Sequence, residues 1–366
     1  MGLKAPGQPL EERELDDLVA FLPPLLQALE RLGFVARYLH PPDFETVLAA
    51  VGQPDAELNA QVPRLQAWPE ALEHVRAPLL AAAEAALPAF AGLRAAPQDP
   101  DGPTAIFRAL RHLPKAQAAL YPLARDLPPV NRFFLDPSAR EGGERLRRLA
   151  KAEPRADTGV LHYDNAPDSR GGFSAYVPED YDPDVAWPLV VALHGGSGNG
   201  GSFLWSWLRD ARTRGAILVA PTAVGRTWAI SGPDPDTPNL HRLLGYVRGR
   251  WNIDPGRILL TGMSDGGTFS YVSGLEQTSP FTHLAPVSAA FHPMLASFAE
   301  PARVTGLPIH IVHGALDWMF PVDMAREAAA GLSRAGADVT YLEIEDLSHT
   351  YPREANAAIL DWLGVG

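Results

Sequence analysis

Apolar residues follow a helical spacing through the N-terminal part of the chain. Between residues 10 and 32 they recur every three or four positions, which gathers them on one face of a helix. The same spacing predicts helices over residues 42–51, 69–93, 104–123 and 138–152. Prolines inside the first and third segments should break or kink them, because proline has no amide hydrogen and its ring clashes with the preceding turn. These prolines are Pro23, Pro24, Pro78 and Pro88. With no strand pattern among these segments, residues 1–155 are predicted to form an all-α domain.

The pattern changes near residue 155 to short apolar runs that alternate with helical stretches. Strands are predicted at residues 172–177, 188–193, 216–220, 258–261, 284–288, 308–313 and 339–344. The first alternates in polarity and stops at Pro178, so it is predicted to be an edge strand. Strands separated by helices of ten or more residues indicate a doubly wound, mostly parallel sheet. Residues 156–366 are therefore predicted to form an α/β domain, in which ligands bind at the carboxyl ends of the strands.

A serine follows the predicted strand 258–261. Ser264 lies in the pentapeptide GMSDG, which matches G-x-S-x-G, and a helical stretch begins directly after it. Such a turn holds the serine in a strained backbone conformation and requires small residues two positions before and after it. Gly262 and Gly266 meet that requirement. The pentapeptide by itself also fits a glycine-rich turn with a surface serine.

Two further strands end near an acid and a histidine. Asp317 follows strand 308–313, and His349 follows strand 339–344. A serine nucleophile needs a base to take its proton and a carboxylate to orient that base, and the chain order serine, acid, histidine is typical of this kind of sheet. The alternative acids are Asp323 and Asp346, and the alternative bases are His292 in the loop after strand 284–288 and His310 and His313 on the strand that precedes Asp317. We favour Asp317 and His349 because each lies beyond the end of a different strand.

The strand at 188–193 runs into a glycine-rich loop that begins HGG. Small residues there allow a backbone N–H to point at the oxyanion of an acyl-transfer reaction. The predicted oxyanion donors are the N–H groups of Gly196 and Asp265. A glycine-rich loop can also hold a phosphate, but this one lacks the Lys-Ser/Thr ending of a P-loop and the frame of a dinucleotide-binding loop. We therefore predict no nucleotide site.

The composition of the chain limits the kinds of ligand and partner that it is expected to bind. The 366 residues carry a net charge of −12 and a pI near 5.4, which argues against nucleic-acid binding. The absence of cysteine excludes disulfides and thiolate metal sites. We expect no metal or organic cofactor. Neither a secretory signal nor an unbroken apolar run of about 18 residues is present, so we expect a cytoplasmic protein with no membrane span. The helical domain is a candidate surface for forming a homo-oligomer.

Four segments together resemble one superfamily. They are LHGGSGNGGSF at 193–203, GMSDGG at 262–267, HGALDWMFPV at 313–322 and LSHTYP at 347–352. They resemble the small lidless esterases of the α/β-hydrolase superfamily, both the carboxylesterase/phospholipase group and the feruloyl-esterase and polyhydroxybutyrate-depolymerase-like group. The resemblance implies a nucleophile, an acid, a base and two oxyanion donors at Ser264, Asp317, His349, Gly196 and Asp265. Asp265 departs from the family, in which Gln, Ala, Gly or Met is common after the nucleophile, so its carboxylate is expected to alter substrate preference or pH response.

The predicted function is hydrolysis of small-molecule carboxylic esters through an acyl-enzyme on Ser264. The alternatives are a peptidase or acyl-aminoacyl hydrolase of the same fold, and a non-catalytic binding protein in which Ser264 is inert. Loops on the expected active face carry Trp228, His292 and Trp318, which are candidates for lining a substrate pocket.

Overall fold

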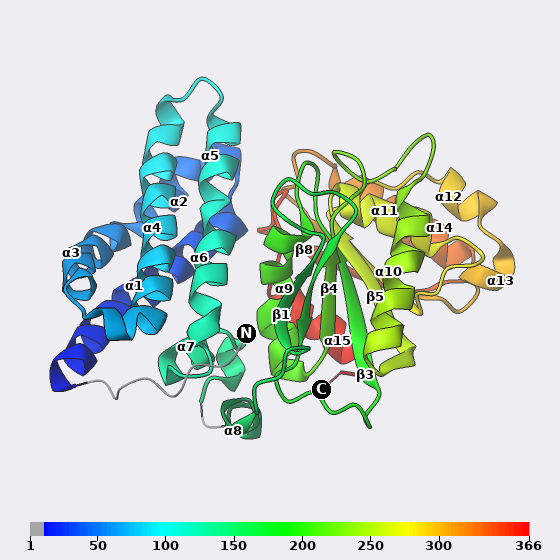
Figure 1. The fold of residues 1–366 in the computed structure, drawn as a ribbon. Helices are drawn as coiled ribbons and strands as arrows, with labels where there is room; N and C mark the ends of the chain where they lie inside the picture. The colour runs from blue at the N-terminus through cyan, green and yellow to red at the C-terminus, as the bar shows by residue number, and fades with distance from the viewer. Residues whose placement is uncertain (1–10, 142, 366) are drawn as a thin grey trace. The chain divides into compact units, whose positions relative to one another are not determined.

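The computed structural model describes residues 11–141 and 143–365 (Figure 1). Its contacts divide the chain into two compact units, residues 1–146 and 147–366, and each unit is described by itself. Leu10, where the first helix was predicted to begin, lies outside the described residues.

The described part of the N-terminal unit is helical. Its helices are α1 (Glu12–Tyr38), α2 (Phe44–Val51), α3 (Pro54–Gln66), α4 (Glu73–Ala95), α5 (Gly102–Leu110), α6 (His112–Leu120) and α7 (Pro128–Phe133), with short 3-10 turns between several of them. Helix α8 (Glu144–Lys151) spans the boundary between the units. The apolar faces of α1 and α4 are buried, with Phe21, Leu25 and Phe90 almost fully enclosed. The sequence pattern did not predict α3 or α7.

The prolines do not interrupt the two longest helices. Pro23 and Pro24 lie inside α1, and Pro78 and Pro88 lie inside α4, yet each helix is continuous. The prediction of a break was therefore wrong. Proline fixes φ near the helical value and removes one hydrogen bond, while the residues that follow, such as Leu25 and Leu79, are completely buried. Packing of the apolar face offsets the lost hydrogen bonds.

Two segments of this unit have the length and hydropathy of a membrane span. They are Glu12–Tyr38 and Glu70–Gln98, and 44% of the apolar window in each is buried. A partly buried core helix of a globular domain meets the same two criteria. The expectation of no membrane span therefore stays a prediction.

The C-terminal unit is built on one eight-stranded sheet. The strands are β1 (Gly159–Tyr163), β2 (Phe173–Val177), β3 (Trp187–Leu193), β4 (Ile217–Pro221), β5 (Ile253–Met263), β6 (His283–Val287), β7 (Pro308–Gly314) and β8 (Asp338–Ile344). Their order is β1-β2-β4-β3-β5-β6-β7-β8. All neighbours from β4 to β8 pair in parallel, whereas β2 pairs antiparallel with both β1 and β4. The predicted mostly parallel α/β sheet and the helical N-terminal region are confirmed.

The predicted edge strand is not at the edge. Strand β2 lies between β1 and β4, and all five of its residues are buried. The edge on this side of the sheet is β1. The sequence pattern missed β1 because its residues are at most partly buried and carry a weak apolar signal. Alternating polarity in β2 thus reflects small and polar side chains that pack inside, such as Ser174.

Helices cover both faces of the sheet (Figure 1). They are α9 (Gly200–Arg214), α10 (Asp236–Arg250), α11 (Asp265–Gly274), α14 (Val322–Arg334) and α15 (Ala355–Trp362). Helices α9 and α15 pack against each other, while α11 packs on β5 and β6 and α14 packs on β7 and β8. Between β6 and β7 the chain forms only the short helices α12 (Met294–Phe298) and α13 (Pro301–Val304). The carboxyl ends of β3 to β8 therefore share one edge, where the predicted site residues follow.

Gly200 tests the packing of α9 on the sheet. A Cβ on Gly200 would lie 1.9 Å from the carbonyl oxygen of Ala220 at the end of β4. Because a Cβ on Gly200 would meet backbone atoms of β4, which cannot rotate away as a side chain can, we expect Gly200→Ala to destabilise the unit by about 3 kcal/mol or more. Urea unfolding followed by tryptophan fluorescence measures this, because seven of the eight tryptophans lie between residues 187 and 362.

The matched control is Gly245→Ala. Gly245 is an exposed residue inside α10, and a Cβ there meets nothing within 4 Å. This variant should gain up to about 1 kcal/mol from helix propensity. Equal unfolding midpoints for the two variants would contradict the packing described for Gly200.

Candidate active site

Ser264 occupies the sharp turn between β5 and α11. Its backbone has φ 55° and ψ −120°, a conformation that L-residues avoid and that costs about 1–3 kcal/mol. The Ser264 N–H donates to the carbonyl of Val287 at 3.0 Å. A Cβ on Gly262 would lie 2.5 Å from the backbone of Gly266, and one on Gly266 would lie 2.5 Å from the carbonyl oxygens of Leu193 and His194. Only glycine fits on either side of this turn.

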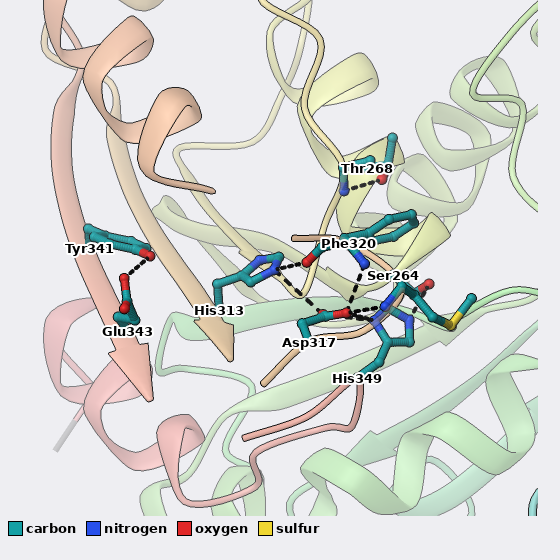
Figure 2. A network of polar contacts seen from close by, with 10 residues as sticks. Ser264, Thr268, His313, Asp317, Phe320, Tyr341, Glu343 and His349 are labelled. Atoms are coloured by element: carbon teal, nitrogen blue, oxygen red, sulfur yellow. Dashed lines mark hydrogen bonds and ion pairs between the residues drawn. The ribbon is translucent and has the colours of Figure 1, made fainter. Parts of the chain in front are cut away.

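A continuous hydrogen-bonded series joins Ser264, His349 and Asp317 (Figure 2). The Ser264 hydroxyl lies 3.0 Å from His349 Nε2, and His349 Nδ1 lies 2.8 Å from Asp317 Oδ2. A carboxylate only accepts, so Nδ1 carries the proton and Nε2 is free to accept from the serine. The three residues are buried, with exposures of 8%, 5% and 7% in the order of the series. Their elements, β5, β7 and β8, deliver them from one edge of the sheet.

The Asp317 carboxylate is held by the loop that carries it. Its Oδ1 accepts from the N–H groups of Met319 and Phe320 at 2.9 and 2.8 Å. Burial acts to raise the Asp317 pKa, but the hydrogen bonds from His349 and Phe320 outweigh it, and the net pKa lies below its ordinary value. The Phe320 ring also meets the His349 ring edge-on at 5.2 Å between centroids. The acid is therefore ionised at neutral pH and the base has one orientation.

The rival residues lie elsewhere. His313 Nε2 donates to the Phe320 carbonyl at 2.9 Å and lies 3.5 Å from Asp317 Oδ2 (Figure 2), so it contacts the acid and not the serine. His310 packs against Trp362, and His292 is exposed. Among the alternative acids, Asp323 pairs with Arg326 on the surface and Asp346 is exposed. Within residues 11–141 and 143–365, His349 Nδ1 pairs with Asp317 and His349 Nε2 with Ser264, so Asp317 and His349 are the residues that the structure brings to the serine.

His194 shapes the loop between β3 and α9. Its Nε2 accepts from the Ala223 N–H at 3.1 Å, so Nδ1 carries the proton and donates to the Gly195 carbonyl at 2.7 Å. The ring is buried, and this desolvation lowers its pKa to about 4. A neutral histidine thus braces the loop, and a Cβ on Gly195 would lie 3.7 Å from Ser264 Cβ. The HGG loop lies directly beside the serine.

The two residues predicted as oxyanion donors are neighbours. Asp265 is the first residue of α11, so no carbonyl within its helix accepts its N–H. Gly196 is exposed on the HGG loop, and a Cβ there would lie 3.0 Å from Asp265 Oδ2. The Asp265 carboxylate accepts from the Thr227 hydroxyl at 2.5 Å. Both backbone groups therefore lie at the rim of the serine turn.

The residues predicted to line a pocket have three different environments. Trp228 is 2% exposed, stacks on Phe269 and donates from its indole nitrogen to the His194 carbonyl at 2.8 Å. It supports the HGG loop from within the core and does not form a solvent-facing wall. His292 and Trp318 are exposed in the loops after β6 and β7. Within residues 11–141 and 143–365, no group of three or more His, Asp or Glu side chains is arranged to hold a metal ion.

Sequence reasoning missed the residues that fix these loops. Asp236 is buried and accepts from the N–H groups of Val224 and Ala229 at 2.7 and 2.9 Å. Thr227 lies between those two anchors and reaches Asp265. Neither residue belongs to a motif, and the contacts join positions far apart in the chain. The only sequence feature that pointed to these loops was the HGG motif, whose histidine, His194, is buried and holds the loop.

Comparison with known proteins finds similarity to esterases over part of the chain. Residues 236–364 match the phospholipase/carboxylesterase family, a segment that contains Ser264, Asp317 and His349. A probable feruloyl esterase C from Aspergillus niger is 24% identical over 164 residues, which is 43% of this chain and 58% of the relative. A bifunctional acetylxylan esterase/xylanase from Neocallimastix patriciarum is 29% identical over 147 residues, 39% of this chain and 21% of the relative.

The chain therefore spans less than two thirds of the length of either relative. Among solved structures, a thermostable esterase superposes with a TM-score of 0.47 at 21% identity and covers 57% of this chain and 62% of its own. The matched segment, the related esterases and the mixed eight-stranded sheet point the same way. The C-terminal unit resembles an α/β-hydrolase esterase of the phospholipase/carboxylesterase type.

Proposed function

We propose that the C-terminal unit is a serine esterase that hydrolyses carboxylic esters through an acyl-enzyme on Ser264. The observation that carries the proposal is the hydrogen-bonded series from Ser264 through His349 to Asp317, with the serine at positive φ. In this arrangement the base already accepts from the nucleophile, and the acid already fixes the base.

Acylation begins when His349 Nε2 takes the proton of the Ser264 hydroxyl as Oγ attacks the ester carbon. The Asp317 carboxylate stabilises the imidazolium that forms, without taking the proton itself. The N–H groups of Gly196 and Asp265 would donate to the oxyanion of the tetrahedral intermediate. Collapse of this intermediate breaks the carbon–oxygen bond, and His349 gives its proton to the departing alcohol.

Deacylation repeats the same steps with water in place of the alcohol. His349 removes a proton from water, the hydroxide attacks the acyl carbon, and Ser264 leaves with its proton restored. Every step uses side chains of this unit, and the two oxyanion donors serve both halves. The related proteins are named for feruloyl and acetylxylan ester hydrolysis, so aryl-acyl and acetyl esters are the first substrates to assay.

A fluorophosphonate probe tests the nucleophile. The purified chain should be labelled at Ser264, and Ser264→Ala should abolish both labelling and ester hydrolysis, because no other hydroxyl in the described chain contacts His349 Nε2. Label site is read by mass spectrometry of the digested protein. An unlabelled Ser264 would reject the esterase and support a binding role, whereas faster turnover of aminoacyl amides than of matched acetyl and feruloyl esters would favour a peptidase.

Asp317→Asn tests the acid. The amide cannot stabilise the imidazolium and would favour the wrong tautomer of His349, so kcat should fall by about 1,000-fold or more, with little change in KM. Asp323→Asn is the matched control, since Asp323 is an exposed carboxylate in the first turn of α14. If both variants kept wild-type kcat, Asp317 would have no part in the reaction.

His194 predicts an acid-sensitive fold. Its folded pKa of about 4 is below its unfolded pKa of 6.5, so only the unfolded chain binds the proton between these values. As pH falls from 6.5 to 4, this group should lower the free energy of unfolding by roughly 3 kcal/mol, and below pH 4 its contribution should level off. His194→Gln should reduce this slope, measured by urea unfolding at several pH values.

The slope will not vanish in that variant, because burial also lowers the pKa values of His162, His283 and His310. Replacing the exposed His292 by Gln provides the comparison. A wild-type slope retained in His194→Gln would mean that the buried ring does not carry this acid sensitivity.

A further inference from the structure

A fixed negative charge lies beside the expected oxyanion position. Asp265 directly follows Ser264, and its Oδ2 would lie 3.0 Å from a Cβ on Gly196. Asp265 is also the first residue of α11, where a negatively charged side chain interacts favourably with the partial positive charge of the helix N-terminus. A carboxylate close to a developing oxyanion does not help the reaction by itself, so the charge needs another explanation.

The surrounding loop holds this carboxylate in one place. The Thr227 hydroxyl donates to Oδ2 at 2.5 Å. Thr227 lies between Val224 and Ala229, whose N–H groups are both bound by the buried Asp236. In residues 11–141 and 143–365 no hydrogen bond to Oδ1 of Asp265 is seen, and the side chain is partly exposed. The Asp265 carboxylate is therefore held in place through Oδ2, while Oδ1 accepts no hydrogen bond from the described residues.

Two exposed arginines lie near these loops: Arg226 directly precedes Thr227, and Arg170 comes from the segment between β1 and β2. Arg170 Nη1 donates to the Gly198 carbonyl at 3.0 Å. Both guanidinium groups are exposed, so solvent screens them strongly. Asp265 is only partly exposed and lies closer to Ser264 in the chain, so its field should dominate at the ester.

We propose that Asp265 is a specificity residue that favours esters with a cationic group a few bonds from the carbonyl and disfavours anionic ones. This inference rests on the proposed esterase activity. A positive group near the ester would be attracted to Oδ1, and a negative group would be repelled. Two charges a few ångströms apart in a partly exposed site change binding by roughly tenfold or more.

Three acetate esters whose alcohol groups are cationic, neutral and anionic test the proposal. They are acetylcholine, its neutral isostere 3,3-dimethylbutyl acetate, and the anionic 2-sulfoethyl acetate. Wild-type kcat/KM, followed by acid release in a pH-stat, should rank them cationic, neutral, anionic. Asp265→Asn should reduce the ratio of cationic to anionic kcat/KM by about tenfold or more, and added salt should reduce the wild-type ratio in the same direction.

Three variants separate charge from structure. Thr227→Val keeps the charge but frees the carboxylate, so it should weaken the discrimination less than Asp265→Asn does. Asp323→Asn removes a first-turn carboxylate from α14 and should leave the ratio unchanged. Arg170→Gln removes a solvent-screened positive charge and should not lower the ratio.

The outcomes keep the two proposals distinct. Failure of the wild type to hydrolyse all three esters would reject the esterase. Hydrolysis with no charge preference, a preference for the sulfoethyl ester, or an unchanged ratio in Asp265→Asn would reject the role of Asp265 alone. Should Asp265→Asn fold poorly, the salt dependence of the wild-type ratio decides.

Discussion

The strained backbone of Ser264 is the constraint on which the site depends. A residue with φ near +55° gains nothing from its own conformation, so its surroundings must hold it. Helix α11 crosses β5 and the end of β3 and holds the turn in place. Gly262 and Gly266 lie so close to neighbouring backbone atoms at this crossing that no side chain would fit on either. The hydrogen bond from the Ser264 N–H to Val287 ties the turn to β6. The result is a hydroxyl held at the edge of the sheet.

The partners of the serine arrive from other strands and are held by their own loops. Asp317 is fixed by two backbone N–H groups within its loop, and His349 is fixed by Asp317 and by the edge of Phe320. On the other side, His194 and Trp228 hold the HGG loop from the core. Each group that would act on an ester is therefore supported by buried neighbours, which is what preorganised catalysis requires.

A second set of polar contacts, around Asp265, lies next to the group formed by the serine, the histidine, the acid and the HGG loop. Asp236 orders the loop after β4, that loop presents Thr227, and Thr227 holds the Asp265 carboxylate next to Gly196. The two hydrogen bonds of Asp236 fix the loop, and the hydrogen bond from Thr227 fixes the Asp265 carboxylate beside Ser264. The position of the Asp265 carboxylate therefore depends on the order of this loop through one hydrogen bond.

The sequence by itself determined the sheet class, and it predicted the serine turn and the two side chains, Asp317 and His349, that the structure brings to Ser264. These features depend on local spacing and on the shared edge of parallel strands. It could not determine that α1 and α4 pass through their prolines, since burial of distant apolar faces decides that. It also could not reveal that β1 covers β2, that Trp228 is internal, or that Thr227 meets Asp265. Those features rest on contacts between segments far apart in the chain, and only the tertiary structure brings them together.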